Sequence, residues 1–124
     1  MGSAMLDGCL ILIAEDEPLI AIDLDDTFGS AGARVVNATT MAAALLIAED
    51  ADLAAAIVDY RLADGDSIEL CACLRDRKIP FMLYTGYPPS GACPGGLFVS
   101  KPATPTDLLS AMSELLNLEG GAPR

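Results

Sequence analysis

The sequence predicts an α/β fold in which five parallel strands form a doubly wound sheet with helices on both faces. Continuous apolar runs bounded by polar residues, of which Cys9–Ala14 is the first, are typical of strands that helices cover on both faces. Segments with apolar residues at helical spacing alternate with these runs, and this alternation favours right-handed crossovers between parallel strands. Sheets of this kind bind ligands at the carboxyl ends of their strands, so function is expected at that edge.

The same patterns place the individual elements along the chain. The expected strands are Cys9–Ala14, Arg34–Ala38, Ala54–Val58, Phe81–Tyr84 and Leu97–Ser100. The expected helices run from Pro18 to just before Gly32, from Met41 to about Asp50, from Ile68 through Leu74, and from Pro105 through Leu116. Thr39 or Thr40 is expected to cap the second helix, and Asp66 or Ser67 the third.

One segment interrupts this alternation of strands and helices. Residues Gly86–Gly96 contain three prolines and four glycines, a composition that does not sustain a regular helix. The helix expected between the fourth and fifth strands should therefore be short, irregular or missing.

Length and composition indicate one domain and exclude several classes of partner. At 124 residues the chain is near the commonest domain size, with residues 1–7 expected as a tag or disordered lead and residues 119–124 as a flexible tail. Hydrophobic residues make up 52% of it, yet no run approaches the roughly 18 apolar residues that span a bilayer, and no signal peptide is evident. We therefore expect a cytoplasmic protein with no membrane partner. A net charge of −11 would repel a phosphate backbone, so direct contact with nucleic acid is not expected.

The cysteines are expected to be reduced thiols without a catalytic role. The chain has four of them, Cys9, Cys71, Cys73 and Cys93, and no histidine, which argues against zinc and against histidine catalysis. Cys71 and Cys73 are two residues apart on an expected helix, so their side chains point about 200° apart. Cys93, in a loop, is an oxidisable thiol, but no neighbour in the sequence favours its thiolate.

Polar residues of one chemical kind follow the predicted strands where those strands end. Glu15 and Asp16 follow the first strand, Asp59 the third, Thr85 the fourth and Lys101 the fifth. In a parallel sheet these positions share one edge, and three clustered carboxylates stay ionised only with a cation among them, for which Mg²⁺ is suited. A lysine and a threonine hydroxyl beside them can contact a phosphoryl group. The pattern predicts phosphoryl transfer to Asp59 as the nucleophile.

These residues, in this order, resemble the signature of response-regulator receiver domains in two-component signalling. The resemblance covers essentially the whole chain and implies a flavodoxin-like sheet of strand order 2-1-3-4-5. It implies that Asp16 and Asp59 ligate Mg²⁺ directly, with the backbone carbonyl of Arg61 as a third ligand and Glu15 acting through water. Asp59 would be the phosphorylation site.

The resemblance also assigns the residues that respond to phosphorylation. Lys101 would pair with the phosphoryl group, and the Lys101-Pro102 bond resembles one that is cis in receivers. Thr85 would turn toward the phosphoryl group, and Phe98 matches the aromatic switch position, although a core aromatic is an equal alternative. Arg61 and Tyr87 could gate access to the phosphoryl group or be ordinary surface side chains.

The resemblance implies a signalling module rather than an enzyme. A histidine kinase or a histidine phosphotransfer protein would supply the phosphoryl group, and output would be contact with a downstream protein or use as a phosphate relay. Phe81–Tyr87 is loosely similar to the strand-four signature of the single-domain FAT GUY receivers, with Tyr84 as a departure. The alternatives are a phosphorylation-independent interaction module, a fragment of a larger regulator, and a small Mg²⁺-dependent phosphohydrolase, which Arg61 disfavours by standing where a general acid would be needed.

Overall fold

The computed structural model describes residues 5–86 and 93–116 of the chain. Its main sheet has five parallel strands in the order β2-β1-β3-β6-β7, which confirms the predicted fold class and strand order. These strands are β1 (Leu10–Ala14), β2 (Arg34–Ala38), β3 (Ala55–Val58), β6 (Phe81–Thr85) and β7 (Leu97–Ser100). The central strands β3 and β6 are buried along their whole length, as expected for strands covered on both faces.

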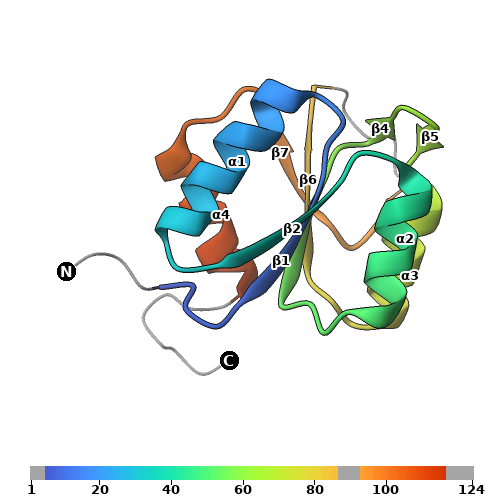
Figure 1. The fold of residues 1–124 in the computed structure, drawn as a ribbon, viewed down its shortest axis with the longest axis horizontal. Helices are drawn as coiled ribbons and strands as arrows, with labels where there is room; N and C mark the ends of the chain where they lie inside the picture. The colour runs from blue at the N-terminus through green and yellow to red at the C-terminus, as the bar shows by residue number, and fades with distance from the viewer. Residues whose placement is uncertain (1–4, 87–92, 117–124) are drawn as a thin grey trace.

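Four helices in the described residues cover the two faces of this sheet (Figure 1). They are α1 (Pro18–Ser30), α2 (Met41–Asp50), α3 (Ile68–Asp76) and α4 (Pro105–Leu116). Helices α1 and α4 lie on one face and share a core cluster that includes Phe28 and Met112. Helices α2 and α3 lie on the other face, over a cluster that includes Phe81. The sheet is therefore the middle of three layers.

The helix ends agree with the predicted signals, and the structure chooses between the cap candidates of α2 and α3. Pro18 begins α1, and Gly32 follows its end with a φ of 104°, a backbone conformation that favours glycine. Of the two candidates for α2, Thr40 is the cap, and its hydroxyl accepts from the N–H of Ala43. At the start of α3, Ser67 occupies the cap position, but the Asp66 carboxylate accepts from the N–H of Ile68.

Two local features differ from the sequence prediction. The turn-rich stretch after Asp59 contains a small antiparallel hairpin, β4 (Arg61–Leu62) and β5 (Gly65–Asp66), where only a turn was expected. Before β1, residues 5–8 form a turn in which Leu6 is fully buried, and the Leu6 N–H donates to the carbonyl of Ala31. The structured part of the chain thus begins ahead of residue 8.

The predicted irregularity of Gly86–Gly96 falls mostly on residues 87–92, which lie outside the described residues. Cys93 and the three residues after it form bends and turns that lead into β7. No helix in the described ranges is long and apolar enough to cross a membrane.

Candidate functional site

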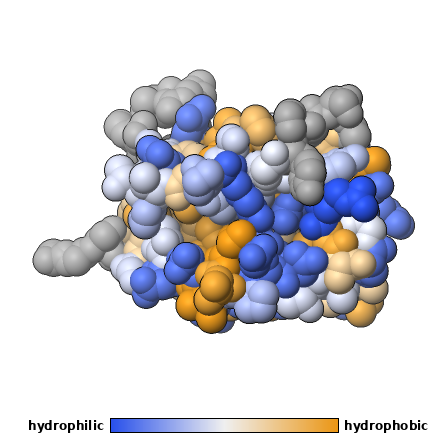
Figure 2. All heavy atoms as spheres, turned by 90° about the horizontal axis from the view of Figure 1, so that it is seen from above, coloured by the Kyte–Doolittle hydropathy of each residue, from blue (hydrophilic) through white to orange (hydrophobic). Residues whose placement is uncertain are grey.

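The predicted site residues do meet at the carboxyl edge of the sheet. Each of the three backbone N–H groups that follow β1, β3 and β7 continues the hydrogen bonding of the sheet by one residue. Glu15 donates to Ala38, Asp59 to Ala14, and Lys101 to Thr85, each with a donor–acceptor distance of 3.0 Å. The first charged residue after each strand is therefore fixed to the sheet. Figure 2 looks onto this edge, where hydrophilic residues surround a hydrophobic patch.

Three carboxylates form an acidic cluster at the centre of this edge. Glu15, Asp16 and Asp59 each offer a carboxylate oxygen, and these oxygens all lie within 4.8 Å of one another. Glu15 and Asp59 are buried, whereas Asp16 is exposed. This donor set fits Mg²⁺, because it consists of hard oxygen ligands, converges on one point and remains open to solvent through Asp16.

Lys101 supplies positive charge to the cluster. Its ammonium nitrogen lies 2.8 Å from Oε1 of Glu15 and 3.0 Å from Oδ2 of Asp59. Two of the three carboxylates thus share this ammonium group, and an excess of negative charge remains in the acidic cluster. A divalent cation would offset that excess.

The direction of the pKa shifts agrees with this shortage of positive charge. Burial raises the pKa of Glu15 above its ordinary value, although its bonds from Lys101 and from the Glu17 N–H act in the opposite direction. Burial alone would lower the pKa of Lys101, but its bonds to Glu15 and Asp59 outweigh burial and raise that pKa. Lys101 therefore stays charged, while its bond to Glu15 offsets only part of the cost of burying the Glu15 carboxylate.

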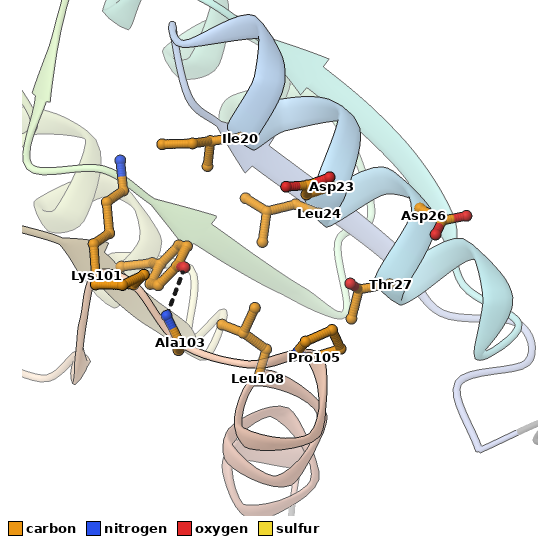
Figure 3. A pocket seen from close by; sticks show the side chains of 11 residues that line it. Ile20, Asp23, Leu24, Asp26, Thr27, Lys101, Ala103, Pro105 and Leu108 are labelled. Atoms are coloured by element: carbon orange, nitrogen blue, oxygen red, sulfur yellow. Dashed lines mark hydrogen bonds between the residues drawn. The ribbon is translucent and has the colours of Figure 1, made fainter.

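Tyr84, the residue at which the chain departs from the FAT GUY signature, contacts the side chain of Lys101. Its ring is buried, and the ammonium of Lys101 lies 5.7 Å from the ring centroid, within the range of a cation–π contact. The hydroxyl of Tyr84 accepts from the Ala103 N–H at 3.0 Å (Figure 3). One side chain thus holds the loop on both sides of the Lys101–Pro102 bond, which is cis, as the resemblance implied.

A pocket of about 360 Å³ opens beside this loop, between α1 and the start of α4 (Figure 3). Apolar side chains from both helices form much of its wall, among them Ile20, Leu24 and Leu108. Tyr84 and Lys101 also line it, so the pocket borders the acidic cluster. Sequence analysis did not identify this pocket, because it depends on how α4 packs beside α1.

Asp64 anchors the loop on the opposite side of the site. Its carboxylate accepts from the N–H groups of Met41, at 2.6 Å, and Ala42, at 3.2 Å, which are the first two of α2. These backbone hydrogen bonds lower the pKa of Asp64 below its ordinary value. Together with the Thr40 cap, Asp64 satisfies the first three N–H groups of α2 and ties the Asp59 loop to that helix.

The remaining site residues occupy distinct environments. Thr85 is fully buried at the end of β6, and its carbonyl accepts a hydrogen bond from the Lys101 N–H. Phe98 is 42% exposed on β7, so the alternative that it is a core aromatic is wrong. Arg61 is exposed in β4, and the role of its carbonyl as a metal ligand stays a prediction. Tyr87 lies outside the described residues.

Comparison with known proteins agrees with the resemblance to response-regulator receiver domains. The chain is 34% identical over 122 residues to the phyllosphere-induced regulator PhyR of Methylorubrum extorquens, in a match that covers 92% of this chain and 46% of PhyR. It therefore spans about half the length of that curated relative. The REC domain of the PhyR response regulator from Erythrobacter litoralis matches with a TM-score of 0.79 at 26% identity, over 98% of both chains.

A third similarity concerns the fold alone. The receiver domain of a sensor histidine kinase from Pseudomonas aeruginosa, solved with magnesium in its active-site cleft, matches with a TM-score of 0.79 at 22% identity, over 89% of this chain and 98% of that one. No protein-family model matches the chain. The fold and these similarities confirm the predicted resemblance. The chain has the fold of response-regulator receiver domains and resembles them in sequence.

Proposed function

We propose that this chain is a phosphoacceptor receiver domain whose Asp59 accepts a phosphoryl group in the presence of Mg²⁺. The observation that carries the proposal is the position of Lys101, whose ammonium bonds both Asp59 and Glu15 beside a third carboxylate. This arrangement supports the proposal, because Asp59 as nucleophile, the carboxylates as oxygen ligands and Lys101 as the phosphate-binding cation would share one small site. The structural neighbour that holds magnesium in its active-site cleft supports the choice of metal.

In the proposed reaction a carboxylate oxygen of Asp59 attacks the phosphorus of the donor. An O–P bond forms and the donor's N–P or O–P bond breaks, so the electron pair returns to the leaving nitrogen or oxygen. Lys101 keeps its charge, because its pKa is raised by its bonds to Glu15 and Asp59 despite burial, and it can pair with the transferred group. Asp16, Asp59 and the carbonyl of Arg61 would hold Mg²⁺, with Glu15 acting through water. The bound metal would offset charge on the phosphoryl oxygens.

Output is proposed to be a shift between two populated states of the region around β6 and β7. Thr85, directly beside Lys101 through its backbone, would turn its hydroxyl toward the new phosphoryl group. Phe98 lies on the neighbouring strand, where it pairs in register with Leu83, and its exposure leaves it room to change rotamer. A downstream protein would recognise the shifted state, and no enzymatic turnover or direct contact with nucleic acid is involved.

The phosphoryl donor is proposed to be a cytoplasmic histidine kinase or phosphotransfer protein that contacts α1. This helix begins two residues after Asp16 and exposes two large apolar side chains, Leu19 at 73% and Ile22 at 61%. Ile22→Glu should slow transfer from such donors but leave transfer from a small phosphodonor unchanged. Leu46→Glu, on α2 and similarly exposed at 64%, is the matched control. Equal slowing by both variants would exclude α1 as the docking helix.

The proposal as a whole is tested by incubation with Mg²⁺ and acetyl phosphate, followed by measurement of acid-labile phosphate on the intact chain. Asp59→Ala should abolish incorporation, because Glu15, the other carboxylate bonded to Lys101 in the described residues, is more deeply buried than Asp59. Asp66→Ala removes an exposed carboxylate from the adjoining hairpin and should retain incorporation. An Asp59→Ala chain that incorporates phosphate at the wild-type rate would refute the assignment.

The rival reading, an interaction module that does not depend on phosphorylation, predicts a different metal response. A titration with Mg²⁺ followed by tyrosine fluorescence should saturate if the acidic cluster binds the metal, since Tyr60 follows Asp59 and Tyr84 lies under Lys101. A flat titration together with absent incorporation would favour the rival.

A further inference from the structure

Two buried cysteines share a site on the α2 and α3 side of the sheet. Cys71 lies in α3 and is fully buried, and Cys93 lies on the connection from β6 to β7 and is 5% exposed. The hydroxyl oxygen of Ser67 lies 4.0 Å from the sulfur of each. All three side chains therefore share one small site between α3 and that connection.

The shared Ser67 hydroxyl brings the two thiols into one neighbourhood. Burial raises the pKa of Cys71, and the nearby Cys93 side chain acts in the same direction. Both cysteines are free thiols, and both belong to the same core cluster. The two remaining cysteines lie in other surroundings: Cys73 is on α3 but points away from Cys71, and Cys9 packs against the opposite core cluster.

We propose that Cys71 and Cys93 are a redox-active pair that forms an intramolecular disulfide when the chain meets a low-molecular-weight disulfide such as oxidised glutathione. One thiolate first displaces a glutathione to form a mixed disulfide, and the second thiolate then attacks the protein-bound sulfur and releases the other glutathione. One S–S bond forms in the protein and two S–H bonds break. The two electrons and two protons pass to glutathione, which leaves as two reduced molecules.

The geometry favours this pair over the others in two respects. Both sulfurs lie 4.0 Å from the Ser67 hydroxyl oxygen and belong to one buried cluster, whereas Cys9 and Cys73 lie in other surroundings. The product would link α3 to the connection between β6 and β7. The raised pKa of Cys71 keeps most of it protonated, which makes the reaction slow and keeps both thiols reduced without an oxidant.

The test uses the native chain. Formation of the disulfide needs no phosphorylation, so the result does not depend on the function proposed above. After incubation with oxidised glutathione, thiol counting in denaturant should find two free thiols in place of four. The chain should remain a monomer, and its mass should be lower by two hydrogen atoms. Cys71 and Cys73 fall in one tryptic peptide, between Arg61 and Arg75. Cys73→Ala is therefore the chain in which peptide mapping should show the link from Cys71 to Cys93.

Two variants and one physical measurement decide the outcome. Cys93→Ala should keep all three of its remaining thiols after oxidation, and Cys9→Ala should lose two, as the wild type does. The oxidised wild type should melt at the same or a higher temperature than the reduced chain, and reduction with dithiothreitol should restore the original midpoint. A lower midpoint after oxidation, a bond to Cys9 or Cys73, or four surviving thiols would overturn the proposal.

Discussion

Asp59 and Lys101 come from loops on opposite sides of the site, and these loops are held in different ways. The Asp59 loop folds into the β4–β5 hairpin, its Tyr60 carbonyl accepts from the Ser67 N–H, and Asp64 binds the start of α2. The Lys101 loop is held on its core side by Tyr84, which contacts both the Lys101 ammonium and the Ala103 N–H. Both loops are joined to the sheet by a backbone hydrogen bond at their first residue. Beyond it, the first loop is held by its hairpin, the Ser67 N–H and Asp64, and the second by one aromatic side chain.

This difference teaches where the site is sensitive to single substitutions. Backbone hydrogen bonds persist when a side chain is changed, so the position of Asp59 should tolerate most substitutions around it. The Lys101 ammonium and the Ala103 N–H, in contrast, both contact the Tyr84 side chain, which one substitution can remove. Apart from substitution of Asp59 itself, we therefore expect the largest effects on phosphoryl transfer from the Lys101 side and mainly effects on stability from the Asp59 side.

The largest effect is expected from the loss of the Lys101 charge. Lys101→Met should slow phosphorylation by acetyl phosphate by about 10²-fold, the usual cost of removing one electrostatic contact to a developing charge. The same change removes positive charge from beside three carboxylates, so Mg²⁺ should bind more tightly than to the wild type. Phosphate incorporation and a fluorescence titration measure the two effects separately. Weaker Mg²⁺ binding with slow transfer would indicate a collapsed site rather than a lost charge.

A smaller effect is expected from Tyr84→Phe, which keeps the ring under Lys101 and removes the hydroxyl. The Ala103 N–H loses its partner, and the free energy of unfolding should fall by about 1 kcal/mol. Phosphorylation should slow several-fold, while Mg²⁺ affinity stays the same because no charge has changed. Denaturant unfolding and phosphate incorporation measure these effects.

The control for this variant is Tyr60→Phe, which removes a hydroxyl from the Asp59 loop. The Tyr60 carbonyl accepts from the Ser67 N–H, and within the described residues no hydrogen bond joins the Tyr60 hydroxyl to the Lys101 loop. This change should therefore leave phosphorylation almost unaffected. Similar slowing by both variants would contradict the contrast between the two loops.

The sequence predicted the parts of this site that depend on the sheet. Runs such as Phe81–Tyr84 are buried on both faces, and their apolar pattern alone identifies them as central strands. Once the strands are parallel, the residues that follow them must share an edge, so Glu15, Asp59 and Lys101 could be brought together without a structure.

The anchors of the two loops could not be predicted in the same way. In the sequence, Tyr84 is indistinguishable from the other residues of a buried apolar strand. Its hydrogen bond from the Ala103 N–H depends on how the chain turns after β7. Asp64 binds the N–H of Met41, which precedes it by 23 residues, so no local capping pattern reveals the contact. The hairpin that carries Asp64 has strands of two residues each, too short to show an alternating pattern. In each case the contact follows from the tertiary arrangement.

The smallest effect tests the anchor of the Asp59 loop through its dependence on pH. Because backbone hydrogen bonds lower the pKa of Asp64 in the folded chain, its ionised form stabilises the fold above its ordinary pKa of 3.8. That contribution is lost as the pH falls through the lower folded-state pKa. Asp64→Ala should therefore destabilise the chain at neutral pH, and the difference from the wild type should shrink toward zero in acid. Phosphorylation at neutral pH should change little, since the hairpin and the Ser67 N–H still hold the loop.

Thr40→Ala is the matched control, because Thr40 caps the same helix end with a hydroxyl that does not titrate. It should cost about 1 kcal/mol, with no dependence on pH in this range. Denaturant unfolding of the three chains at several pH values separates the charged anchor from the neutral one. If both variants lose their effect in acid, the start of α2 has itself unfolded there, and the pH dependence does not belong to Asp64. If only Asp64→Ala loses its effect, the carboxylate is the pH-dependent link between the Asp59 loop and α2.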